Sequence, residues 1–311
     1  MAKIKRRVIQ IANSTQLISL PRKWSLKYNI KKGDELEIRE NGTSLTIFTE
    51  KMLSGEEIVV DVSGLTPRLA DRFLARAYQK GYDKITIKFD NPELMIAIQT
   101  KVKELIGFEV MEQSKNTVVV QSISSKLEID FDSLLRKAFI ITLSMAQDCL
   151  DGLKNNDKKL LENVWYKDFD VNKFCYFCLR SINKGQHEGF GTYILYYLVE
   201  LLEDVGDEYK SLAKLLINTK SKNEIIRILA KVNEVFKLGY EFFYKPEKTK
   251  AVSAMELYNN TRSEIENLYS KMKNKEDLKS LATLDYILKT VYHYPTMRLD
   301  TLKDLSGEKT F

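Results

Sequence analysis

The chain has 311 residues, of which 44% are hydrophobic and 30% are charged, a balance typical of globular proteins with room for two or three domains. No apolar run approaches the length of about eighteen residues that a membrane helix needs, and the N-terminus lacks the apolar centre of a signal peptide. We therefore expect a cytoplasmic protein with no membrane insertion. Its three cysteines are too few, and odd in number, for a disulfide framework.

Positive charge is concentrated at the start of the chain. The first 33 residues contain nine Lys or Arg and no acid, whereas the whole chain has a net charge of +6, so residues 34–311 carry a net charge of −3. A polyanion-binding module attached to an ordinary globular body has this distribution, and DNA is the first partner to consider. The alternative that charge alone leaves open is a solvated basic face without a partner.

Residues 1–50, which we call the head, are predicted to form a small β-rich domain. Apolar runs at 4–11 and 17–20 are typical of strands, and Pro21 ends the second because proline cannot donate to a sheet ladder. A short helix is expected at 22–28, followed by a strand at 35–39, the hairpin signal Asn41-Gly42 and a strand at 44–48. Because about fifty residues bury little core, we expect the head to form a homodimer.

The head resembles the swapped-hairpin DNA-binding domain of the AbrB/MazE/SpoVT superfamily. The resemblance is carried by the basic first strand, Leu20-Pro21, Trp24, the segment 30–34 and the strand around Leu36. In that superfamily two chains interlace their hairpins into a β-barrel, and basic side chains face DNA. The resemblance therefore implies a DNA-binding surface formed by Lys3, Lys5, Arg6, Arg7, Arg22, Lys23 and Lys27.

The head departs from the superfamily at two places where many members have arginine. Gln16 and Leu17 stand at the start of the second strand, and Ser25 and Leu26 stand late in the short helix. Arginine pairs with base edges, whereas scattered cations hold the phosphate backbone. The head is therefore expected to contact phosphates, with less reading of base sequence.

Residues 56–123 are predicted to form a small α/β domain, which we call the connector. The expected order is a strand at 58–62, a helix that begins with Pro67, a strand at 84–89, a helix from Pro92 to about 106, and a hairpin of strands at 108–112 and 117–121. This βαβαββ pattern contains no glycine-rich phosphate loop and no nucleophile motif. A connecting or dimerising role is favoured over a catalytic one.

Residues 127–305, which we call the body, are predicted to be entirely helical. Three long helices are expected at 131–154, 158–184 and 188–218, and three of similar length at 222–244, 247–273 and 276–304. This pattern indicates two three-helix repeats, about 127–219 and 221–305, packed as a bundle. Cys175 and Cys178 lie in an apolar helical pattern, which favours buried structural thiols over a metal or redox site.

Three carboxylates share one face of the third predicted helix of the body. Glu200, Glu203 and Asp207 follow one another at spacings of three and four residues, so they repel one another unless solvent, a basic helix or a cation compensates them. Asp168 and Asp170 on the preceding helix are further candidate oxygen donors. Gly206 is costly inside a helix and indicates close helix approach or room for a ligand. A solvated acidic stripe is the alternative.

The two repeats and the string from Leu202 to Asp207 resemble the PhoU family of phosphate-uptake regulators. In that family acids on this helix and on the preceding one bind divalent or ferric ions. The resemblance implies one metal site formed by Glu203, Asp207, Asp170 and Glu200. In the second repeat Lys289 stands where an acid is expected, which implies that no second site is intact.

The expected fold is multidomain α+β: a swapped-hairpin β-barrel, an α/β connector and an all-α bundle similar to PhoU. This order of parts is similar to archaeal phosphate uptake regulators, which implies a homodimeric DNA-binding transcriptional regulator of phosphate transport and homeostasis. The alternative is an adaptor that contacts a phosphate transporter or a sensor kinase through its helical surface, with a head that only dimerises. An enzyme is not expected, because no nucleophile or acid–base pair accompanies the carboxylates.

Overall fold

A computed structural model describes residues 4–11, 15–41, 44–48, 56–124, 130–186, 191–220 and 222–302. Contacts within the chain divide it into two compact units, residues 1–56 and 57–311. The first unit contains the head, and the second contains the connector and the body together. In the described part of the chain, no helix combines the length and apolar character needed to cross a membrane.

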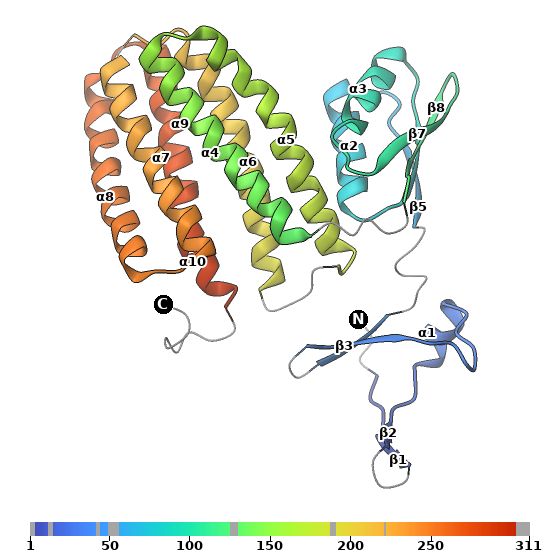
Figure 1. The fold of residues 1–311 in the computed structure, drawn as a ribbon. Helices are drawn as coiled ribbons and strands as arrows, with labels where there is room; N and C mark the ends of the chain where they lie inside the picture. The colour runs from blue at the N-terminus through green and yellow to red at the C-terminus, as the bar shows by residue number, and fades with distance from the viewer. Residues whose placement is uncertain are drawn as a thin grey trace. The chain divides into compact units, whose positions relative to one another are not determined.

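The head consists of two short hairpins and one helix (Figure 1). Strands β1 (Ile9–Ile11) and β2 (Thr15–Leu17) pair antiparallel, as do β3 (Glu37–Asn41) and β4 (Ser44–Phe48). Helix α1 (Arg22–Lys27) lies between them in the chain and has no buried residue. The short helix and the strands of the second hairpin are present near their predicted positions. The first hairpin differs, because β1 covers only the end of the run 4–11 and β2 shares only Leu17 with the run 17–20. The described strands form two separate two-stranded sheets and no closed barrel. A swapped-hairpin barrel would need a second chain.

The connector is a four-stranded sheet with two helices on one face (Figure 1). The sheet order is β5-β6-β8-β7, and β5 and β6 are parallel whereas the other pairs are antiparallel. Ile85 and Ile87 on β6 lie opposite Val120 and Val118 on β8, and these side chains form the buried face against the helices. The elements are β5 (Glu57–Asp61), α2 (Pro67–Gln79), β6 (Lys84–Lys88), α3 (Pro92–Val102), β7 (Phe108–Gln113) and β8 (Thr117–Ser122).

The body is a bundle of long helices with one short helix at its C-terminal end (Figure 1). Side chains of Asp130, Asp157 and Asn274 accept hydrogen bonds from backbone N–H groups in the first turn of the helix that each one caps. The helices are α4 (Phe131–Asn155), α5 (Lys158–Asn183), α6 (Thr192–Leu216), α7 (Lys222–Tyr244), α8 (Lys248–Lys271), α9 (Lys275–Val291) and α10 (Tyr294–Asp300).

Aromatic side chains join the two predicted repeats at the centre of the body. Phe139 on α4 lies with its ring centroid 6.3 Å from that of Phe236 on α7, and 5.5 Å from that of Tyr294 on α10. All three side chains are fully buried. The helices that begin the two predicted repeats therefore share one core, and α4 to α10 pack as a single bundle.

Two details of the body differ from the sequence prediction or refine it. The last predicted helix is not continuous, because α9 ends at Val291 and α10 begins at Tyr294, with Pro295 in its first turn. Proline has no N–H to bond to the preceding turn and its ring clashes with that turn, which kinks or breaks a helix, and here the helix is broken. Cys175 and Cys178 are confirmed as buried thiols. Cys149 is also buried, all three thiols are free, and burial raises the pKa of each.

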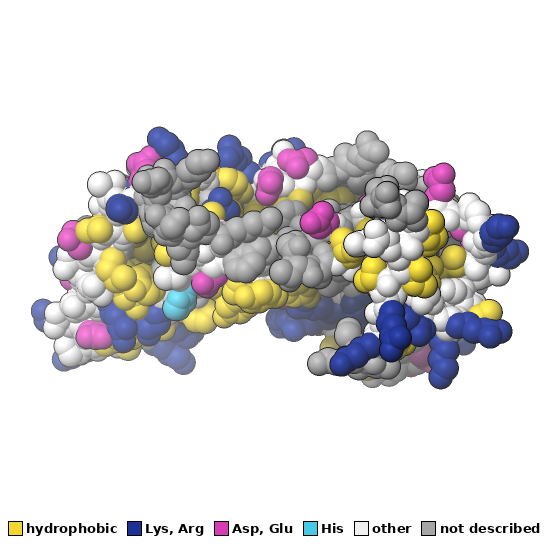
Figure 2. Space-filling model, turned by 90° about the horizontal axis from the view of Figure 1, so that it is seen from below, with side chains coloured by type: hydrophobic (Ala, Val, Ile, Leu, Met, Phe, Trp, Pro, Cys, Tyr) yellow, Lys and Arg dark blue, Asp and Glu magenta, His cyan; other side chains and the backbone are white. Residues whose placement is uncertain are grey.

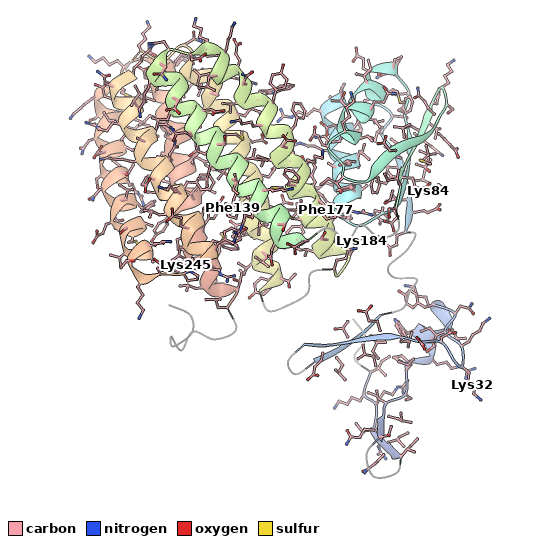
Figure 3. All side chains as sticks on the ribbon, in the orientation of Figure 1. Lys32, Lys84, Phe139, Phe177, Lys184 and Lys245 are labelled. Carbon is pink, nitrogen blue, oxygen red and sulfur yellow. The ribbon has the colours of Figure 1, made fainter. Side chains whose placement is uncertain are left out.

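The connector is docked on the body through charged side chains near the end of α5. Arg180 is 6% exposed and donates from Nη1 to the carbonyl oxygens of Tyr78 and Tyr82, each at 2.8 Å. Asp83 accepts from Arg180 and from Lys184, whose Nζ lies 2.7 Å from Asp83 Oδ1 (Figure 3). Since a guanidinium that is nearly buried is held only when its donors are satisfied, these bonds fix the connector to the body.

Candidate functional site

Two charged regions of the molecule are candidate sites, and the first is the basic surface of the head. Six of the seven predicted DNA-binding residues lie in the described part of the chain, and all six are exposed: Lys5, Arg6, Arg7, Arg22, Lys23 and Lys27. None of the six forms an ion pair with a described carboxylate. Lys3 lies outside the described residues. These cations are therefore open to an external anion.

Apolar side chains of the head are exposed as well. Ile9 is 56% exposed, Leu26 is 70% exposed and Ile38 is 60% exposed, although each belongs to a strand or helix. Figure 2 views the molecule from below and shows hydrophobic and basic side chains next to each other on the visible face. Exposure of this much aliphatic surface to water is unfavourable, and the described residues of the single head do not bury it in a core.

The second candidate site is a cleft of about 650 Å³ between the connector and the body, which we call the acidic cleft. One wall is α2 of the connector, and the other is formed by α5 and α6 of the body. Three of the four predicted metal ligands, Glu200, Glu203 and Asp207, line it. The acids that the sequence places on one face of α6 therefore share one concave surface with basic residues of the connector.

Glu203 is the most perturbed carboxyl of the acidic cleft. Burial, together with the negative charges of Asp207, Asp204 and Glu200, raises the pKa of Glu203 to about 7. Tyr176 on α5 donates from its hydroxyl to Glu203 Oε1 at 3.4 Å. Glu203 therefore changes its protonation near neutral pH, unlike an exposed glutamate, because ionisation would add a charge to an already negative face.

Asp168, Asp207 and Lys210 form an ion cluster at one side of the acidic cleft. Lys210 Nζ lies 2.6 Å from Asp168 Oδ2 and also contacts the carboxylate of Asp207. Asp168 is 4% exposed, and burial raises its pKa against the opposing effect of Lys210. The ammonium of Lys210 therefore lies between two carboxylates and compensates them.

Two acceptor atoms beside this cluster have no hydrogen-bond donor among the residues that the structure describes. They are Asp168 Oδ1 and Asn172 Oδ1, and both residues are more than nine-tenths buried. Gly206 on α6 allows this close packing, since a β-carbon there would lie 3.1 Å from Val171 Cγ1 and 3.8 Å from Asp168 Oδ1. The close helix approach that Gly206 predicted is therefore present, and it brings α6 against the carboxylate of α5.

The connector supplies cations to the opposite wall. Arg76 on α2 pairs with Glu200, with Nη2 3.1 Å from Oε2, and this contact raises the pKa of Arg76. Lys101 on α3 lies 3.1 Å from Asp71 Oδ1 and 2.8 Å from Glu104 Oε2, and its ammonium is 5.4 Å from the ring centroid of Tyr176. Sequence reasoning did not single out these residues. The sequence does contain a pattern that could have identified the arginines of α2. Arg68, Arg72 and Arg76 recur at every fourth residue, which places them on one face of the helix.

Of the two candidate acids on α5, the structure places Asp168, and not Asp170, beside the acids of α6. Asp170 is exposed and does not line the acidic cleft, whereas Asp168 is buried and faces Lys210. Asp168 follows Val164 by four residues and precedes Cys175 by seven, so it falls on the buried stripe of α5. Asp170 is two residues further along the helix, which turns its side chain to solvent.

The residues of the acidic cleft do not fit the predicted metal as they are arranged. In the part of the chain that the structure describes, no group of three or more His, Cys, Asp or Glu side chains is placed to hold a metal ion. Lys210 lies where a cation between Asp168 and Asp207 would have to lie. In the second repeat Lys289 pairs with Asp285 on α9, with Nζ 2.6 Å from Oδ2. In both repeats, therefore, a lysine ammonium compensates the carboxylates at this position.

Comparison with protein-family models gives no match for this chain, and comparison with curated proteins gives none either.

Proposed function

We propose that this protein is a homodimeric DNA-binding transcriptional regulator whose head contacts the phosphate backbone and whose acidic cleft responds to a ligand or a partner. The observation that carries the proposal is the combination, within the described part of one small head, of six exposed cations without a carboxylate partner and of aliphatic side chains that are not buried in a core. A second head would bury the aliphatic side chains and double the positive surface.

Phosphate uptake as the regulated process rests on the resemblance of the body to the PhoU family. The acidic cleft supports a responsive role for the body, because it holds a glutamate with a pKa of about 7 and an ion cluster at the junction with the connector. A ligand that changes the pairing of Arg76 with Glu200 would alter how the connector is held. In this proposal a metal ion would bind only by displacing Lys210.

Fluorescence anisotropy with labelled duplex DNA across a salt series tests the DNA-binding role. The full chain is compared with a chain that lacks residues 1–50. We expect the full chain to bind with a log–log salt slope of several, since each phosphate neutralised contributes about 0.9, and we expect the truncated chain not to bind. Absence of binding by the full chain at low salt would refute the proposal and favour the adaptor that contacts a transporter or sensor.

Sedimentation of the same two chains tests the dimer. The full chain is expected to sediment as a dimer at micromolar concentration. The truncated chain is expected to be a folded monomer, since residues 57–311 form a unit with their own core. A monomeric full chain that still binds DNA would separate the two parts of the proposal.

A further inference from the structure

The connector sheet has one edge without the usual protection against pairing. Strand β5 is the edge of the described sheet, and its five residues contain no proline, no lysine and no bulge. The opposite edge strand, β7, has a register shift between Val110 and Glu112, which disturbs its ladder. Edge strands that are regular and uncharged at their centre accept another strand. Strand β5 therefore has the features of an acceptor.

A groove of about 610 Å³ runs between this edge and helix α2, and we call it the β5–α2 groove. Its apolar wall consists of Leu69, Phe73 and Ala77, which follow one another at every fourth residue of α2. Leu69 is 42% exposed and Phe73 is 45% exposed. An extended segment on β5 would have alternate side chains against this wall, because successive side chains of a strand point to opposite faces.

A row of cations borders the β5–α2 groove. Arg72, Arg76 and Lys80 also recur at every fourth residue of α2, beside the apolar row. Arg76 is paired with Glu200, but Arg72 and Lys80 form no ion pair with any described residue. Among the residues that line the groove, Asp61 is the single acid. The groove therefore favours a segment that carries negative charge.

We propose that the β5–α2 groove binds an extended acidic segment of another protein, which adds to the sheet beside β5. Apolar side chains of the segment pack on Leu69 and Phe73, and a carboxylate between them pairs with Arg72 or Lys80. Backbone hydrogen bonds to β5 supply affinity, and the two rows on α2 supply selectivity. The proposal is independent of DNA binding, since every residue it uses belongs to the connector.

A second copy of this chain is a poorer occupant of the groove. Two β5 strands that pair antiparallel about Val59 place Glu57 of each strand opposite Asp61 of the other. Like charges in direct cross-strand opposition are destabilising, and the pairing also brings two basic rows together. An acidic segment of a different protein meets neither obstacle.

A designed peptide tests this proposal on the full chain. The probe is fluorescein-labelled Thr-Val-Thr-Glu-Thr-Leu-Thr with blocked ends, so that Val, Glu and Leu share one face. Its control has Lys in place of Glu. We expect the acidic probe to bind at least tenfold more tightly than the control in anisotropy. Equal affinities, or no binding of either peptide, would overturn the proposal.

Variants of α2 locate the binding. Arg72→Glu is expected to reverse the preference toward the lysine peptide, and Phe73→Ser to weaken the acidic probe about tenfold. Lys115→Glu, an exposed cation in the turn between β7 and β8, is the matched control and should change neither affinity. Circular dichroism checks that each variant is folded. Binding that is unaffected by Arg72→Glu would place the peptide elsewhere and contradict the proposal.

Hydrogen exchange distinguishes strand addition from other contacts. Saturating acidic probe is expected to slow exchange of β5 backbone amides at residues 57–61, with no change at 108–113 on the opposite edge. If these amides are protected without peptide in a concentration-dependent way, and the chain lacking residues 1–50 sediments as a dimer, the occupant is a second copy and the proposal fails.

Discussion

The head and the acidic cleft are both clusters of like charge in the sequence, but the structure treats them in opposite ways. Cations of the head such as Arg22 and Lys27 are exposed and have no described carboxylate beside them. Most carboxylates of the cleft are half-buried, and cations from three helices pair with Glu200, Asp71 and Asp207. The described carboxylates leave the charge of the head unpaired, whereas that of the cleft is partly balanced within the molecule, and this difference is why we propose an external partner for the head.

The largest expected effect on stability comes from removing the cation that pairs with the buried carboxylate of the cleft. Lys210→Met removes the ammonium from between Asp168 and Asp207, and should lower the free energy of unfolding by about 3 kcal/mol at pH 8, since a nearly buried carboxylate loses its partner. Denaturant unfolding measures it. The loss should shrink as pH falls, because Asp168 then takes up a proton.

The double variant Lys210→Met with Asp168→Asn is the control for this prediction. It removes both charges and should recover most of the lost stability. If the single variant is as stable as the wild type, Lys210 does not stabilise the cluster. The charges of the cleft would then not be compensated within the molecule, as in the head.

The next effect concerns the head. Replacing Arg22, Lys23 and Lys27 together by Gln is expected to weaken duplex DNA binding roughly 100-fold at low salt and to reduce the salt slope by about 2.7, if each cation neutralises one phosphate. Anisotropy across a salt series measures both quantities.

The matched control replaces three exposed cations of the second unit, Lys115, Lys154 and Lys159, by Gln. The net charge changes equally, so an equal loss of affinity would show that net charge, and not the head surface, binds DNA. Unfolding of the head variant should be unchanged, because none of its three replaced side chains is buried.

A smaller effect on stability is predicted for a variant of Glu203, which should raise the free energy of unfolding and not lower it. The pKa of about 7 in the folded chain lies above the ordinary value of 4.5, so ionisation costs stability as pH rises from about 4.5 to 7, and the cost stays constant above pH 7. Glu203→Gln should therefore raise the free energy of unfolding by about 2 to 3 kcal/mol at pH 8 and change it little at pH 4. Thermal unfolding at the two pH values measures the difference, and a variant less stable at pH 8 would contradict it.

The smallest effect is expected in the second repeat. Lys289 pairs with Asp285, but the lysine side chain is 47% exposed and the pair is one helical turn apart. Lys289→Met should change the free energy of unfolding by no more than about 0.5 kcal/mol, because exposed pairs at this spacing contribute little. A loss as large as that for Lys210→Met would mean that the two repeats are compensated alike.

Much of the secondary structure was predictable, because it depends on local patterns. Apolar spacing predicted the long helices from α4 to α8, and the structure adds that Asp157 and Asn274 cap the helices that follow them. The break before Pro295 was also available in the sequence, but the apolar pattern on both sides of it favoured one continuous helix. Periodicity outweighed a local rule there, and the local rule was correct.

For the candidate sites, too, the sequence predicted the features that depend on local pattern and not those that depend on tertiary packing. The basic character of the head and the acidic face of α6 follow from residue type and spacing alone, since charge and helical period are properties of the sequence. Which cations meet those acids was decided only by tertiary packing, because Arg76 and Glu200 are 124 residues apart and Lys210 reaches a carboxylate on another helix. Burial then set the pKa of Glu203 and selected Asp168 over Asp170. Desolvation depends on neighbours that only the folded chain brings together.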